Sequence, residues 1–138
     1  MLLKSWEKNS VYLASLFLAL SGIVWIIFNF ADEENFRLIK FWAIKFHGAF
    51  AMLFLIVFGM LLSRHIIPNF KIRPKRRNSG IILLVIIVFL ILTGYGLYYA
   101  SNENFREFNS LSHQIIGAIS VLIFAAHILL NKTKRRKN

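Results

Sequence analysis

The chain has 138 residues, enough for one domain, and 57% of them are hydrophobic, which is well above the apolar share of an ordinary soluble domain. Its formal net charge is +11, and it contains no cysteine. The lack of cysteine excludes disulfides, thiolate metal sites, iron–sulfur clusters and covalent c-type haem attachment, so any haem would be held non-covalently.

Four stretches of the sequence carry no charge: residues 9–31, 46–63, 78–102 and 108–131. About 20 helical residues cross a hydrocarbon core of about 30 Å, so each stretch spans or nearly spans a membrane. We predict helices at about 9–30, 38–66, 80–100 and 109–131, and we expect Pro68 and Pro74 to help end the second. The predicted fold is all-α: an integral membrane up-down-up-down four-helix bundle, with residues 1–138 forming a single four-span domain.

The first stretch has a second interpretation as a cleaved signal peptide, because Lys4 and Lys8 precede an apolar run. The run is longer than a typical signal core. Asn29-Phe30-Ala31 also lacks the small residue expected three positions before a cleavage point. We therefore expect this stretch to be a membrane helix.

The positive charge is concentrated in two segments, the connection between the second and third stretches and the C-terminal tail. Charges in the other two connections nearly cancel. By the positive-inside rule, the N-terminus, the middle connection and the C-terminus are cytoplasmic, in a multi-pass protein of the inner (cytoplasmic) membrane. Because orientation accounts for the basic excess, we expect no nucleic-acid binding.

Short motifs recur in the two halves of the chain. Ser21-Gly22 recurs as Thr93-Gly94, and Glu-Asn-Phe-Arg at 34–37 recurs at 103–106, with a histidine following each copy. Two helical hairpins from one duplicated unit would explain the repeat and would make spans two and four parallel. Chance similarity between apolar segments is the alternative.

All four histidines lie on the second and fourth predicted spans. His47 and His65 are eighteen residues apart, five whole α-helical turns, and His113 and His127 are fourteen apart, about four turns. Each pair therefore shares one helix face. The two helices are expected to present paired imidazoles at an outer level, with His47 and His113, and at an inner level, with His65 and His127.

Neutral imidazole is a good ligand of haem iron, and iron with histidine on both sides keeps no open position, so its role is electron transfer. The predicted metal ligands are His47, His113, His65 and His127, holding two b haems. By spacing, Leu61 and not His65 matches His127, so either tilt or a kink absorbs this one-turn offset or only one level binds haem. Histidines that serve only as interfacial or packing residues are the alternative.

Other residues could complete a haem site. Small residues beside the histidines, Gly117 among them, allow close approach of a porphyrin or of a neighbouring helix. Haem propionates favour cations, and candidates near the outer level are Arg37, Lys45 and Arg106. Lysine and arginine also occur at the interfaces of membrane proteins in general.

The sequence pattern T-G, H-x-x-x-G, H is carried by Thr93-Gly94, His113, Gly117 and His127. It resembles the small four-helix members of the membrane di-haem cytochrome b superfamily, which includes the cytochrome b subunits of respiratory hydrogenases and formate dehydrogenases. Ser21-Gly22, His47 and His65 form a weaker copy. The resemblance adds Gly94 to the cofactor-binding residues and implies two b haems and a redox partner: a quinone, a c-type cytochrome or a catalytic subunit of a larger complex.

The expected function is a b-type cytochrome of the respiratory chain, an electron-transfer subunit rather than a complete enzyme. The alternative is a haem-free membrane anchor or accessory subunit of a larger complex. A transporter is disfavoured because, apart from the histidines, the spans carry no ionisable group but tyrosine. Aromatic residues near the outer surface could dock a quinone or form an interfacial belt: Trp42, Tyr95, Tyr98 and Tyr99.

Overall fold

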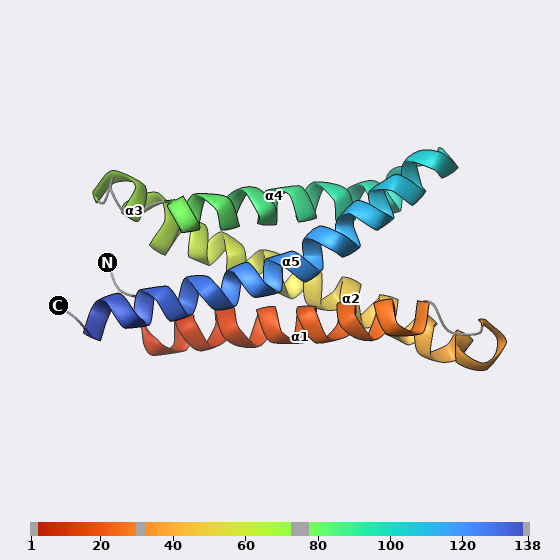
Figure 1. Ribbon diagram of the computed structural model, residues 1–138, viewed down its shortest axis with the longest axis horizontal. Coiled ribbons are helices and arrows are strands. Elements are labelled where there is room, and N and C mark those ends of the chain that lie inside the picture. The colour runs from red at the N-terminus through yellow and green to blue at the C-terminus, as the bar shows by residue number, and fades with distance from the viewer. Residues whose placement is uncertain (1–2, 30–32, 73–77, 137–138) are drawn as a thin grey trace. The chain divides into compact units, whose positions relative to one another are not determined.

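The computed structural model describes residues 3–29, 33–72 and 78–136, and these ranges are helical except at residues 3–4 and 100–102. The predicted all-α class is confirmed. Figure 1 shows the elements, which are α1 (Ser5–Asn29), α2 (Glu33–Leu61), the π-helix η1 (Leu62–Ile66), α3 (Ile67–Ile72), α4 (Asn78–Tyr99) and α5 (Glu103–Arg136).

The chain divides into two compact units, Met1–Lys75 and Arg76–Asn138. In the first unit α1 packs against α2, and in the second α4 packs against α5 (Figure 1). Ser21 contacts His47, and Glu7 contacts Arg64 further along the second helix, so α1 and α2 are antiparallel. Each unit is a helical hairpin, the arrangement that the duplicated-unit hypothesis expects.

Four helical segments in the described ranges are long and apolar enough to cross a membrane: Ser5–Asn29, Asn35–Asn69, Ser79–Tyr99 and Glu103–Leu129. Large apolar side chains on them are exposed, for example Ile56 at 72% and Leu122 at 71%. Among the residues whose burial is described, four buried ones are polar, Glu7, Ser21, Thr93 and Asn109, and two are apolar, Val11 and Ala43. Apolar groups outside and polar groups inside are what a lipid solvent favours, and the chain is a multi-pass membrane protein.

All four long helices begin earlier than predicted, and polar side chains cap two of them. The Lys4 backbone N–H donates to Glu7 Oε2 at 2.7 Å, and α1 starts at Ser5. The Phe105 N–H donates to Asn102 Oδ1 at 3.0 Å, and α5 starts at Glu103. Side chains of this kind satisfy the unpaired N–H groups of a first helical turn, so charged residues join the helix ends.

The second predicted helix contains a π-helical turn and continues past Pro68. The Ile67 N–H donates to the Leu62 carbonyl, an i to i+5 bond, and α3 then runs to Ile72. The prediction that Pro68 helps end this helix is wrong, because Pro68 lies in the first turn of α3, where proline is tolerated. Pro74 and the cations at 75–77 and 137 lie outside the described residues.

The π turn changes the helical phase on which the pairing of His47 and His65 depends. A π turn holds one residue more than an α turn, so it rotates the residues that follow. His65 lies inside this turn. The eighteen residues between the two histidines are therefore not five uninterrupted α-helical turns.

Candidate functional site

The four histidines lie on α2, η1 and α5, and all four are partly buried. The hydrogen bond at Nδ1 identifies the neighbour that holds each imidazole. In three of the four, this neighbour is a hydroxyl of a Ser-Gly or Thr-Gly dipeptide on the adjacent helix.

His47 is held by Ser21 and makes close contact with Gly22. Its Nδ1 lies 3.2 Å from Ser21 Oγ, and the Ser21 hydroxyl donates its one proton to the Leu18 carbonyl at 2.9 Å. Because that proton is committed, Nδ1 of His47 must supply the proton of the bond to Ser21. In neutral imidazole this places the lone pair on Nε2.

Gly22 provides the space that the His47 ring occupies. A methyl group at position 22 would lie 3.0 Å from Cε1 and 3.3 Å from Nδ1 of His47. A side chain there would displace the imidazole. The pair Ser21-Gly22 thus supplies both the hydrogen-bond acceptor and the room for the ring.

His113 has the same arrangement in the second hairpin. Its Nδ1 lies 2.8 Å from Thr93 Oγ1, whose proton is directed to the Phe89 carbonyl at 2.9 Å, with the Leu90 carbonyl at 3.2 Å. Nδ1 is again the donor, which leaves the lone pair on Nε2. A methyl group at Gly94 would lie 3.4 Å from His113 Cε1, so the predicted site residue Gly94 contacts the histidine itself.

His127 contacts a third dipeptide of this kind, Ser79-Gly80, which the sequence analysis missed. Its Nδ1 lies 3.1 Å from Ser79 Oγ, and a methyl group at Gly80 would lie 3.9 Å from its Cε1. Fourteen residues separate Ser79 from Thr93, and fourteen separate His113 from His127. This equal spacing on two antiparallel helices could have identified Ser79 as the partner of His127 from the sequence. It places His113 and His127 about 21 Å apart along α5.

His65 differs from the other three because its partner lies on its own helix. The Asn69 side-chain amide donates to the His65 carbonyl at 2.6 Å and lies 3.2 Å from Nδ1. A carbonyl can only accept, so the amide NH₂ group faces His65, and Nδ1 is the acceptor. In neutral imidazole the proton is then on Nε2, the opposite state to His47 and His113.

An ion pair occupies the second level of the first hairpin. Fourteen residues before Ser21 is Glu7, whose Oε1 accepts from Arg64 Nη1 at 2.7 Å. Glu7 is 3% exposed, and the Arg64 side chain is 50% exposed. The first hairpin thus has a carboxylate and a guanidinium where the second has Ser79 and His127.

The other predicted site residues lie on exposed or loosely packed surfaces. Arg37, Lys45 and Arg106 are exposed, and Lys45 Nζ lies 4.4 Å from the centroid of the Phe41 ring. A methyl group at Gly117 would meet only Leu90, at 3.9 Å. A side chain at position 117 would thus meet Leu90 and not a histidine ring.

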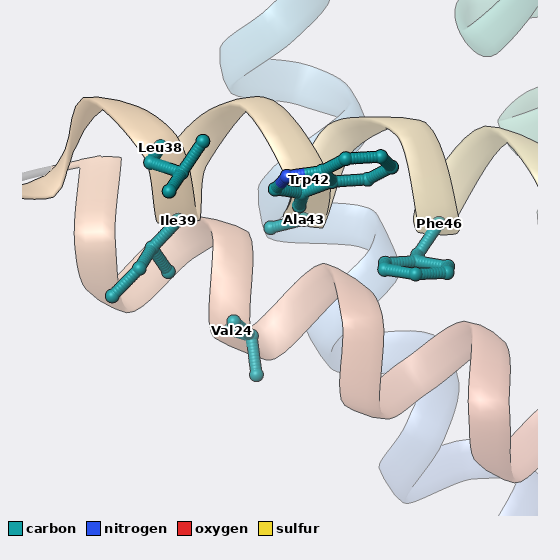
Figure 2. A pocket seen from close by; sticks show the side chains of 6 residues that line it. All are labelled: Val24, Leu38, Ile39, Trp42, Ala43 and Phe46. Carbon is teal, nitrogen blue, oxygen red and sulfur yellow. The ribbon is translucent and has the colours of Figure 1, made fainter.

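An apolar groove lies beside the His47 region of the first hairpin. Figure 2 shows the side chains that line it, Val24, Leu38, Ile39, Trp42, Ala43 and Phe46. Trp42 thus lies against an apolar surface of α1 and α2, as expected of a residue in contact with lipid.

His47 and His113 thus each have Nδ1 held by a hydroxyl within their own hairpin. A histidine that binds a metal usually donates its other ring N–H to a fixed acceptor, which orients the ring and raises its basicity. Among the described residues no group of three or more His, Asp or Glu side chains could hold a metal ion. A haem iron needs only two protein ligands.

No protein-family model matches this chain, and no curated protein or solved structure matches it. The resemblance to membrane di-haem cytochromes b therefore stays a prediction that depends on the residues named above.

Replacing Gly22 with alanine is expected to destabilise the first hairpin. The added methyl group would push the His47 ring off Ser21, and overpacking of this kind costs about 1–3 kcal/mol. The matched control is Gly59→Ala, because nothing lies within 4 Å of a methyl group at that position. The control should be neutral or gain up to about 1 kcal/mol from helix propensity. Thermal unfolding in detergent measures both, and equal Tm values for the two variants would contradict this role of Gly22.

Proposed function

We propose that the protein is a b-type cytochrome that carries electrons within a membrane, with His47 and His113 as the ligands of a haem iron. The observation that carries the proposal is the matching geometry of these two imidazoles. Nδ1 of each lies within hydrogen-bond distance of a hydroxyl that also donates to a helix carbonyl. The sequence predicts the two histidines at the same level of two parallel spans.

The chemistry that haem supplies here is reversible one-electron transfer, because two histidine ligands leave no coordination position for a substrate. The protein's part is to hold and tune the ligands. Ser21 and Thr93 fix the rotation of the imidazole rings and raise their basicity. The exposed cations Arg37, Lys45 and Arg106 follow the helix connections and would pair with the propionates.

The inner level supports a second haem less directly. His127 has a hydroxyl partner in Ser79, as a ligand would. His65 would have to give up its bond with Asn69 before its Nε2 could bind iron. The haem of the outer level therefore comes first in this proposal, and the second haem remains the expectation of the sequence pattern.

The proposed role needs a partner that gives or takes the electron: a quinone, a c-type cytochrome or a catalytic redox subunit of a larger complex. The connections between the helices are too short for a substrate domain, so the chain suits a subunit and not a complete enzyme. The sorting of the charges favours the inner (cytoplasmic) membrane with both termini in the cytoplasm.

A haem-free anchor is the second candidate, and the same contacts favour it in a different way. A hydrogen bond between a histidine and a hydroxyl on the next helix joins two membrane helices without any cofactor. In that case the three Ser/Thr–His bonds serve packing alone.

A pyridine haemochrome assay on protein from haem-replete cells separates these functions. We expect at least one b haem per chain, and we expect His47→Ala and His113→Ala each to remove it, because each deletes an iron ligand. His65→Ala should leave that haem in place. If the wild type holds a second haem per chain and His65→Ala removes it, the second haem is at the inner level. Colourless wild-type protein would contradict the cytochrome and leave the anchor.

Replacing Ser21 with alanine is expected to weaken haem binding without removing a ligand. Loss of such a partner lowers metal affinity about 10–100-fold. The matched control is Ser120→Ala. The Ser120 hydroxyl also donates to the carbonyl three residues earlier, that of Gly117, at 2.7 Å, but it is not the partner of a histidine described above. Titration of haem-free protein with hemin measures both affinities. Equal affinities in the two variants would show that Ser21 has no part in ligation.

A further inference from the structure

A buried amide lies one helical turn before His113 on α5. Asn109 is 6% exposed, and its Nδ2 donates to the Thr93 backbone carbonyl at 2.7 Å. Residues four apart share a helix face, so Asn109 and His113 both face α4. A buried amide in a membrane helix is kept only where its polar atoms have partners.

Asn109 and His113 bind the same residue of α4. The Thr93 carbonyl accepts from Asn109, and the Thr93 hydroxyl accepts from His113 Nδ1 at 2.8 Å. The proton of that hydroxyl is held by the Phe89 carbonyl at 2.9 Å. Thr93 is therefore fixed at its backbone and at its side chain, with its acceptor directed at the imidazole.

Gly94 and Gly96, one and three residues after Thr93, make room for the side chains of His113 and Asn109. A methyl group at Gly96 would lie 2.8 Å from Asn109 Nδ2, and one at Gly94 would lie 3.4 Å from His113 Cε1. Asn109 thus fills space that any side chain at position 96 would need. The close approach of α4 and α5 here depends on both glycines.

The first hairpin lacks this clamp, although its histidine is held in the same way. Four residues before His47 is Ala43, and three residues after Ser21 is Val24, where the second hairpin has Asn109 and Gly96. Both residues line the apolar groove of Figure 2. The bond from His47 to Ser21 is 3.2 Å, against 2.8 Å from His113 to Thr93.

We propose that Asn109 is a positioning residue that holds Thr93 against His113 and keeps the proton of this imidazole on Nδ1. This inference rests on the proposed function for its redox consequence. A firmly held Nδ1–H makes His113 the more basic of the two ligands, and a more basic ligand stabilises ferric iron. Asn109 would therefore lower the reduction potential of a haem held by His113.

The test replaces Asn109 with leucine, which keeps the volume and removes the donor. The matched control is Gln114→Leu, because the Gln114 amide donates to Ser110 on its own helix. In haem-free protein labelled with ¹⁵N-histidine, nuclear magnetic resonance reports which His113 nitrogen carries the proton and how fast it exchanges. We expect exchange of Nδ1–H to quicken roughly five- to thirtyfold in Asn109→Leu, the factor for one lost hydrogen bond, and to stay unchanged in Gln114→Leu.

A second measurement and a second variant keep the two proposals separable. In haem-loaded protein, Asn109→Leu should raise the reduction potential and Gln114→Leu should not. If Asn109→Leu fails to fold, Gly96→Ala takes its place, because the added methyl group displaces the Asn109 amide. A His113 proton on Nε2 in the wild type, or unchanged exchange in the variant, overturns the inference. Protein that binds no haem but shows the expected exchange overturns the cytochrome and supports the clamp.

Discussion

The structure depends on one constraint. A polar side chain inside a membrane must find its hydrogen-bond partners within the protein, because lipid tails offer none. Among the described residues, four of the six buried ones are polar, and the bonds of Ser21 and Thr93 join neighbouring helices within each hairpin. The apolar side chains face outward and add little to pairing, because lipid is as apolar as they are. The Ser-Gly and Thr-Gly dipeptides matter for this reason: the hydroxyl satisfies an imidazole and the glycine lets the two backbones approach.

The sequence predicts the four helices well, because long uncharged stretches have few other solutions. Their ends are less predictable, since caps at Glu7 and Asn102 extend the helices into charged segments. The repeat of Ser21-Gly22 and Thr93-Gly94 is visible in the sequence, whereas its contact with His47 and His113 depends on how the hairpins pack. The position of His65 could not be predicted from helical phase, because the π turn at Leu62–Ile66 breaks that phase.

The two hairpins share one polar contact between their helices and differ at the other. Near the short connection between its two helices, each hairpin has a histidine hydrogen-bonded to a hydroxyl of the neighbouring helix. In the second hairpin Asn109 also binds the residue that carries this hydroxyl, Thr93. At the opposite end of the helices, the second hairpin has the same kind of contact between Ser79 and His127. The first hairpin has the Glu7–Arg64 ion pair there. The Glu7 carboxylate is held by Arg64, whereas the second hairpin has an imidazole held by a hydroxyl at this end.

The proposed haem would have the imidazoles of His47 and His113 as its two iron ligands. The electron paramagnetic resonance spectrum of the oxidised protein, purified from haem-replete cells, tests it most directly. In the His65→Ala variant, which removes a ligand of the inner level, we expect a low-spin ferric signal with two imidazole ligands that is lost when His47 or His113 is also replaced. A high-spin ferric signal in the His65→Ala variant, or a low-spin signal that survives these further replacements, would contradict the proposal.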